Sequence, residues 1–122
     1  MQLQDILTSI SDEDVEHVYE SVNGKINSDE GIGAFEKIKG IMYAFRSAYM
    51  AKGQQKNMHR SYVSLEKNYK VISGKLDIHL REMSEKRQTT IPKEEATELV
   101  SNLHLVLNGF RELAKSIDRD EL

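Results

Sequence analysis

The first third of the chain carries the side chains best suited to hold a metal ion. Glu13, His17 and Glu20 are spaced four and three residues apart, which places them on one face of a helix. Metal sites in helical bundles add ligands from a second helix, commonly as paired Glu-x-x-His motifs. The nearest segments, Asp14-Val-Glu-His17 and His79-Leu-Arg-Glu82, shorten the acid or reverse the order. We therefore expect no metal ion and no other cofactor. A cation bound by Glu13, His17 and Glu20 ranks third, after the protein-binding and nucleic-acid-binding hypotheses given below.

Motifs that carry enzymatic catalysis are also missing from the sequence. It has no Gly-x-Ser-x-Gly elbow, Walker loop or His-Glu-x-x-His motif, and it has no cysteine that could act as a nucleophile. Gly31-Ile-Gly33 resembles a fragment of a phosphate loop, but Glu36 stands where the third glycine would fall. Asp29 and Glu30 would also repel phosphate. We therefore expect that the protein is not an enzyme.

Small residues recur every seven positions in the same region. Gly33, Gly40 and Ser47 follow this spacing, and Ala44, Ala48 and Ala51 add to the set. Small side chains on one helical face let a neighbouring helix approach closely. The pattern predicts a packing face here, because an interior glycine otherwise costs about 1 kcal/mol of helix stability.

Charge is segregated along the 122 residues, although the total of 17 basic and 20 acidic residues gives a net charge of only −3. Residues 1–36 carry a net charge of −8, residues 37–75 carry +8 and the remaining residues carry −3. The sign of the charge therefore changes from one segment of the chain to the next.

The basic segment forms an exposed ridge if Tyr62 and Tyr69 face a neighbouring helix. Arg60 and Lys67 then lie on the row opposite this seam, and Lys70 lies on the row beside it. A row opposite the seam points outward, where a second molecule or solvent can reach it. The predicted partner-binding residues are Lys52, Lys56, Arg60, Lys67 and Lys70.

Three interpretations of this ridge compete. It is a solvated lysine-rich face, a contact for a protein partner with an acidic surface, or a contact for the phosphate backbone of nucleic acid. The acidic total and the lack of zinc-finger ligands or an RNP-type aromatic motif weigh against nucleic acid. We expect a non-catalytic protein-binding module, such as an adaptor, inhibitor or regulator, with a nucleic-acid-binding accessory protein as the alternative.

The apolar periodicity predicts that helices present these residues. From Met58 onward the spacing alternates strictly between four and three residues, which indicates a helix over about residues 56–84 with a coiled-coil-like seam. The seam residues are Met58, Tyr62, Leu65, Tyr69, Ile72, Leu76, His79 and Met83.

A wider apolar stripe in the last third predicts a central helix covered by two or more neighbours. We expect its N-cap at Thr90 and Pro92 in its first turn. The stripe comprises Ala96, Leu99, Val100, Leu103, Val106, Leu107, Phe110, Leu113, Ala114 and Ile117.

Two further helices precede residue 53. One has its N-cap at Asn27 or Ser28 and its C-cap at Gly53. The other starts at a capping box formed by Ser11 and Asp14 and closes at Asn23-Gly24. The sequence thus predicts one all-α domain over residues 1–122: an antiparallel bundle of three long helices plus a short N-terminal helical segment, with coiled-coil-like packing.

A long, thin bundle has a modest core, and self-association would compensate for it. We therefore expect a homo-oligomer, most simply a homodimer, with Tyr62, Tyr69 and His79 at its interface. The alternative is a monomeric up-down bundle, with the tyrosines in the core of one chain. No apolar run is long enough for a membrane span, and the start of the chain lacks the features of a signal peptide. We expect a cytoplasmic protein without membrane contact.

Overall fold

A computed structural model describes residues 2–52 and 58–120 of the chain. Helices are the only regular structure within these residues, so the expected all-α class is confirmed. The five helices are α1 (Leu3–Leu7), α2 (Asp12–Val22), α3 (Ser28–Ala51), α4 (His59–Ser84) and α5 (Lys93–Asp120).

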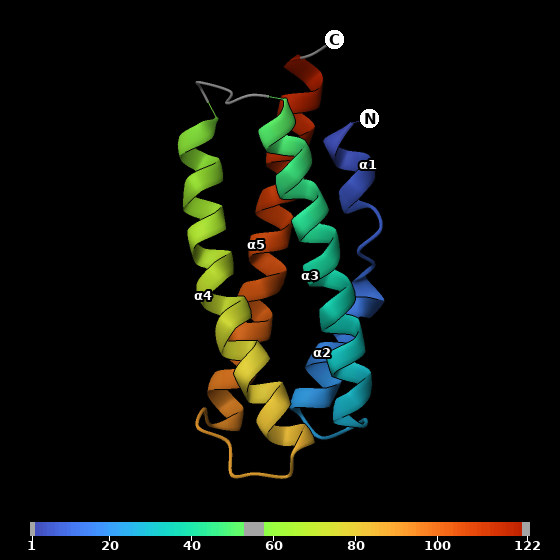
Figure 1. Cartoon of the computed structure of the whole chain (residues 1–122), viewed down its shortest axis with the longest axis vertical. Helices are drawn as coiled ribbons and strands as arrows, with labels where there is room; N and C mark the ends of the chain where they lie inside the picture. Colours follow the sequence, from blue (N-terminus) through green and yellow to red (C-terminus); the bar gives the residue numbers. More distant parts are fainter. Residues whose placement is uncertain (1, 53–57, 121–122) are drawn as a thin grey trace.

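The helices lie side by side along one long axis, and α1 and α2 follow each other in the same direction (Figure 1). α2 packs on α3 and α5, and α4 also packs on α3 and α5, so that α2 and α4 lie on opposite sides of the bundle. α1 continues the line of α2 and contacts the same two helices. The N-terminal segment is therefore a full member of the bundle and closes the side that three long helices would leave open.

Side-chain caps fix where α2 and α3 begin. The Ser11 hydroxyl accepts a hydrogen bond from the Asp14 N–H at 3.2 Å, and the Asp14 carboxylate accepts one from the Ser11 N–H at 2.9 Å. This is the predicted capping box. Asn27 caps α3 by accepting a bond from the Asp29 N–H at 2.8 Å. Gly24, with φ at +74°, turns the chain between the two helices, as the Asn23-Gly24 pair predicts.

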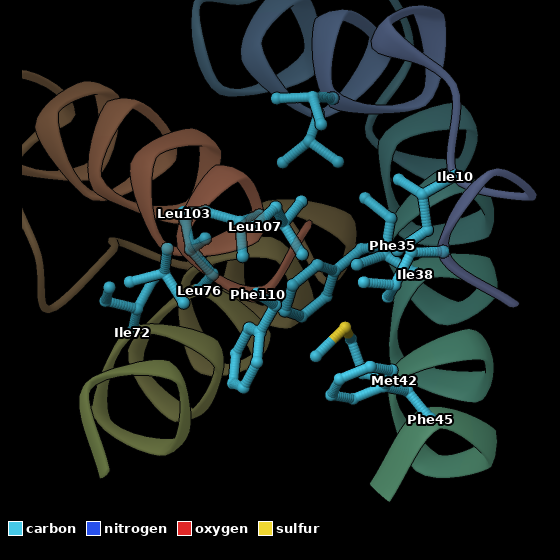
Figure 2. Close-up of a cluster of buried hydrophobic side chains, with 14 of the residues drawn as sticks. Ile10, Phe35, Ile38, Met42, Phe45, Ile72, Leu76, Leu103, Leu107 and Phe110 are labelled. Atoms are coloured by element: carbon cyan, nitrogen blue, oxygen red, sulfur yellow. The ribbon is translucent and has the colours of Figure 1, made fainter. Parts of the chain in front are cut away.

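α5 buries its wide stripe against more than one neighbour, since it packs on α1, α2 and α4. All ten residues of that stripe are buried. Figure 2 shows the Phe110 side chain of α5 directed toward Met42 and Phe45 of α3. The Phe110 and Phe45 rings meet edge to face, with centroids 5.5 Å apart. Burial of this stripe removes a large apolar area from water and so stabilises the fold.

The start of α5 differs from the prediction. The helix begins at Lys93, and Thr90 is not its N-cap. Instead, the Thr90 N–H and hydroxyl both donate to the Glu82 carboxylate, at 3.2 and 3.0 Å. The Glu82 carboxylate in the last turns of α4 therefore accepts both hydrogen bonds that Thr90 donates in the segment leading into α5. The predicted C-cap at Gly53 lies outside the described residues.

The predicted packing face of small residues is wrong except at Ala48, which is partly buried against the core. A Cβ built at Gly33 or Gly40 would meet no atom within 4 Å, and Ala44 and Ser47 are exposed. Close approach occurs at Gly31, where an added Cβ would collide with Ser21 of α2. Seven-residue spacing places residues on one face but does not say whether a neighbour covers that face.

Candidate functional site

A pocket of about 220 Å³ opens between α3 and α4. Its floor is aromatic and apolar, and it consists of Met42 and Phe45 from α3, Tyr62 and Tyr69 from α4, and Phe110 from α5. The Phe110 ring stands at the centre, with its centroid 6.1 Å from that of Tyr62 and 6.3 Å from that of Tyr69. Three helices therefore supply a floor that suits an apolar group.

The rim of this pocket is mostly cationic. Lys39 and Arg46 border it from α3, Lys70 borders it from α4, and Glu66 is the one carboxylate among its lining residues. Arg46 Nε lies 2.9 Å and Lys70 Nζ 3.4 Å from the same Glu66 oxygen, Oε1. Lys39 Nζ lies 2.9 Å from an oxygen of Asp77 and 2.9 Å from an oxygen of Glu36, so two carboxylates pair with its charge. Arg46 and Lys70 share one carboxylate, and the positive charge of the rim therefore lies on this pair.

Helical spacing explains why these groups meet. Glu66, Tyr69 and Lys70 follow Tyr62 by four, seven and eight residues, which places them along one flank of α4. On α3, Lys39 and Arg46 are seven residues apart and border the buried row that contains Met42 and Phe45. Packing α3 beside α4 brings the two flanks together.

The two tyrosines contribute neutral donors to the pocket. Burial raises the pKa of Tyr69 to about 12. Burial also raises the pKa of Tyr62, and the nearby carboxylate of Glu66 adds to that rise. Both phenols therefore remain protonated at neutral pH and can donate hydrogen bonds. The charge of the pocket lies on its rim.

The structure separates the residues of the predicted ridge. Lys70 lies on the rim of the pocket, whereas Arg60 and Lys67 are exposed on the outward face of α4. In residues 2–52 and 58–120 neither Arg60 nor Lys67 forms an ion pair. Lys52 ends α3 and interacts with the charge of Asp118 in α5. Lys56 lies outside the described residues.

Two of the three predicted interface residues are buried within a single chain. Tyr62 and His79 are each 2% exposed, so neither side chain is on the surface of this fold, and Tyr69 is partly buried. The Tyr62 ring stacks on that of Tyr49 in α3, with centroids 3.8 Å apart. Both tyrosines therefore contribute to the core of a single chain, which is the alternative position given for them in the sequence analysis.

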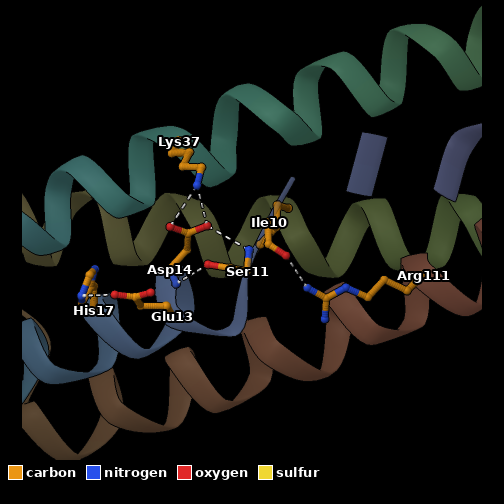
Figure 3. A network of polar contacts seen from close by, with 7 residues as sticks. All are labelled: Ile10, Ser11, Glu13, Asp14, His17, Lys37 and Arg111. Carbon is orange, nitrogen blue, oxygen red and sulfur yellow. Dashed lines mark hydrogen bonds and ion pairs between the residues drawn. The ribbon is translucent and has the colours of Figure 1, made fainter. Parts of the chain in front are cut away.

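The acidic N-terminal segment lies away from the basic residues of α4. Asp14 of α2 pairs with Lys37 of α3 at 3.0 Å, and Figure 3 shows the Lys37 side chain reaching down to this carboxylate. On the same helix, Glu13 lies 3.7 Å from His17. The described part of the chain holds no group of three His, Cys, Asp or Glu side chains placed to bind a metal ion.

Sequence reasoning missed the half of the pocket that α3 supplies. The signal was present: Lys39 and Arg46 are basic residues beside the apolar row of the third predicted helix. What the sequence lacks is the information that this row lies next to Glu66 and Lys70, because that depends on how two helices pack.

No family model, curated protein or solved structure matches this chain. None of the described helices has both the length and the apolar character needed to cross a membrane.

Proposed function

We propose that this protein is a non-catalytic binding module for another protein, such as an adaptor, inhibitor or regulator. Its partner inserts one apolar side chain, borne on an acidic segment, into the pocket between α3 and α4. The observation that carries this proposal is the combination of an aromatic floor with two cationic side chains on the rim, Arg46 and Lys70, that share a single carboxylate.

The size of the pocket supports a single side chain as its occupant. Sites for small molecules and cofactors usually enclose about 300–1,000 Å³, which exceeds the volume of about 220 Å³ found here. Complete burial of a Leu or Phe side chain contributes about 1.5–3 kcal/mol. That is enough to anchor a segment whose other contacts are weak.

The charge of the rim supports an acidic partner. Arg46 and Lys70 have only the Glu66 carboxylate between them, so each retains unused donors toward solvent. A partner carboxylate beside the anchoring side chain would complete their hydrogen bonds. Such complementary charge increases the association rate and disfavours basic partners.

The outward face of α4 gives nucleic acid some support as a second candidate. Arg60 and Lys67 are exposed there, seven residues apart, where phosphate groups could reach them. The same face also exposes Val63, Val71 and Ile78, which contribute nothing to phosphate binding. The aromatic floor of the pocket likewise suits an apolar side chain and not a phosphate group, so a protein partner is favoured over nucleic acid.

We further propose that α3, α4 and α5 pack as an antiparallel bundle with coiled-coil-like contacts. The alternating directions of these helices support this arrangement (Figure 1). Seven-residue spacing between inward-facing residues also supports it, as in Tyr62, Tyr69 and Leu76 of α4.

Short synthetic peptides can test the proposed partner chemistry. The test peptide contains Asp and Glu around one central Leu or Phe; one control replaces the apolar residue by Ser, and a second replaces the acids by Lys. We expect the test peptide to shift the methyl NMR signal of Met42 and to bind at least about tenfold more tightly than either control.

Two lysine variants separate the pocket from general charge. Lys70→Glu should weaken binding of the acidic peptide, whereas Lys115→Glu, an exposed position on α5 outside the pocket, should leave it unchanged. Equal binding of the acidic and basic peptides, or no change at Met42, would contradict the proposal. If duplex DNA instead binds tightly and with a steep salt dependence, the nucleic-acid alternative becomes the better one.

A further inference from the structure

The outward surface of α4 and α5 exposes apolar side chains around a shallow groove. Val71 and Ile78 of α4 are each 54% exposed, and Leu105 of α5 is 65% exposed. Val71 and Leu105 line the groove between the two helices, with Asn68 and Asn102 beside them. We call this surface the α4–α5 face. It lies on a different flank of α4 from the aromatic pocket.

The two helices of this face carry opposite charges. The exposed charged residues on the outward side of α4 are Arg60, Lys67, Lys75 and Arg81, which are all basic. The corresponding residues of α5 are Glu94, Glu98 and Glu112, which are acidic, and Arg119, one basic residue seven positions beyond Glu112 near the end of the helix. Within the described ranges, Lys67, Lys75, Glu98 and Glu112 form no ion pair. The face therefore has a basic half and an acidic half with apolar residues between them.

We propose that a second copy of this chain binds to the α4–α5 face and forms a two-fold symmetric dimer. The symmetry axis runs parallel to the helices, so that α4 of each copy lies on α5 of the other. This arrangement places the basic half of each face on the acidic half of the other. The alternative two-fold axis, perpendicular to the helices within the interface, would place basic α4 on basic α4 and is disfavoured by repulsion.

Positions along the bundle axis match the proposed pairing. Val71 and Leu105 line one groove and so lie at one level of the bundle. Lys67 precedes Val71 by four residues, about 6 Å, and Glu112 follows Leu105 by seven residues, about 10.5 Å. Because α4 and α5 run in opposite directions, both displacements point toward the same end of the bundle (Figure 1).

Rotation about an axis parallel to the helices leaves these levels unchanged. Lys67 of one copy therefore comes to within about 4.5 Å, along the axis, of Glu112 in the other. Side chains of a helix tilt toward its N-terminus, which in antiparallel helices tilts these two toward each other. Lys75 and Glu98 have the same offsets from Val71 and Leu105 toward the opposite end of the bundle.

The area of the face also suits a dimer. Two helices spaced about 10 Å apart, each with about 36 Å of length in contact, present about 700 Å² per copy. This is close to the area of about 800 Å² per partner that stable protein interfaces bury. The pocket between α3 and α4 stays open in the dimer, so partner binding and dimerisation can be tested separately.

Reciprocal charge reversal tests this interface. Sedimentation or light scattering should show that the wild-type chain is a dimer at concentrations on the order of 100 μM. Lys67→Glu alone and Glu112→Lys alone should each weaken the dimer at least about tenfold, because each repulsive contact occurs twice across a two-fold interface. An equimolar mixture of the two variants should dimerise again, since every contact in the mixed dimer then joins opposite charges.

The mixture distinguishes contacts between copies from effects within one chain. Circular dichroism of each variant verifies that it is folded, and Lys115→Glu serves as the matched lysine reversal outside the α4–α5 face. Three results would each overturn the proposal: a monomeric wild-type chain, variants that dimerise like the wild type, or a mixture that stays monomeric. Peptide binding at the pocket should be unchanged in Lys67→Glu, so failure of the dimer leaves the proposed partner site intact.

Discussion

Asp118, near the end of α5, accepts a hydrogen bond from the backbone N–H of Leu3 at 3.0 Å across 115 positions of the chain. Its other carboxylate oxygen accepts bonds from the N–H and side-chain amide of Gln4, at 2.9 and 3.1 Å. No side chain of α1 caps its own start, so a carboxylate from α5 takes that role. The first and last helices are thereby joined.

Removal of this carboxylate should destabilise the protein. Asp118→Ala leaves two buried or partly buried N–H groups without their acceptor, and we expect a loss of about 1–3 kcal/mol in the free energy of unfolding. Urea denaturation measures this loss. Asp120→Ala, at an exposed position on the same helix, is the control and should change the free energy of unfolding by less than about 0.5 kcal/mol.

Exposed glycines in α3 should be sites of stabilisation. Gly33→Ala and Gly40→Ala add a Cβ that meets no other atom, and alanine favours the helix by about 1 kcal/mol over glycine. We expect each variant to raise the melting temperature. Gly31→Ala should lower it, because its Cβ would collide with Ser21. A lower melting temperature in the Gly33 and Gly40 variants would indicate that something covers this face in solution.

The buried faces of the long helices were predictable, and the contacts between them were not. Regular spacing was sufficient to identify the stripe of α5 and the seam around Leu76, because burial along a helix follows its period. The starts of α2 and α3 were also predictable, since Ser11 and Asn27 bond to N–H groups a few residues away. These features depend only on neighbours in the sequence.

The candidate site required information that helical periodicity does not contain. Lys70 belonged to the predicted set, but its neighbours Lys39 and Arg46 come from another helix, and their proximity depends on how α3 packs beside α4. The same limit explains the error at Thr90, whose hydroxyl bonds to Glu82 on the preceding helix. The preference of threonine for N-cap positions predicted that Thr90 would cap α5, but its hydrogen bonds go to Glu82 of α4 instead.

His79 should make the protein less stable in mild acid. Burial lowers its pKa below the ordinary value of 6.5, although the charge of Glu82 and the backbone of Ile91 oppose that shift. The unfolded chain therefore binds a proton at this histidine more readily than the folded chain does. The free energy of unfolding should decrease as the pH falls from above 6.5 toward the lowered pKa. In His79→Gln this part of the decrease should disappear, and an unchanged pH profile would refute the role of His79.

Glu66 should limit how tightly the pocket binds an acidic partner. Its carboxylate holds Arg46 and Lys70, so an incoming carboxylate must compete for the same two cations. Glu66→Gln removes this competition but retains a side chain of similar size. We expect the variant to bind the acidic, Leu-containing peptide several-fold more tightly, because the competing negative charge is gone. Glu98→Gln, which removes an exposed charge outside the pocket, should not change peptide affinity. If both variants have the same affinity, the rim cations do not contact the peptide; if Glu66→Gln binds more weakly, Glu66 holds the cations in their binding positions.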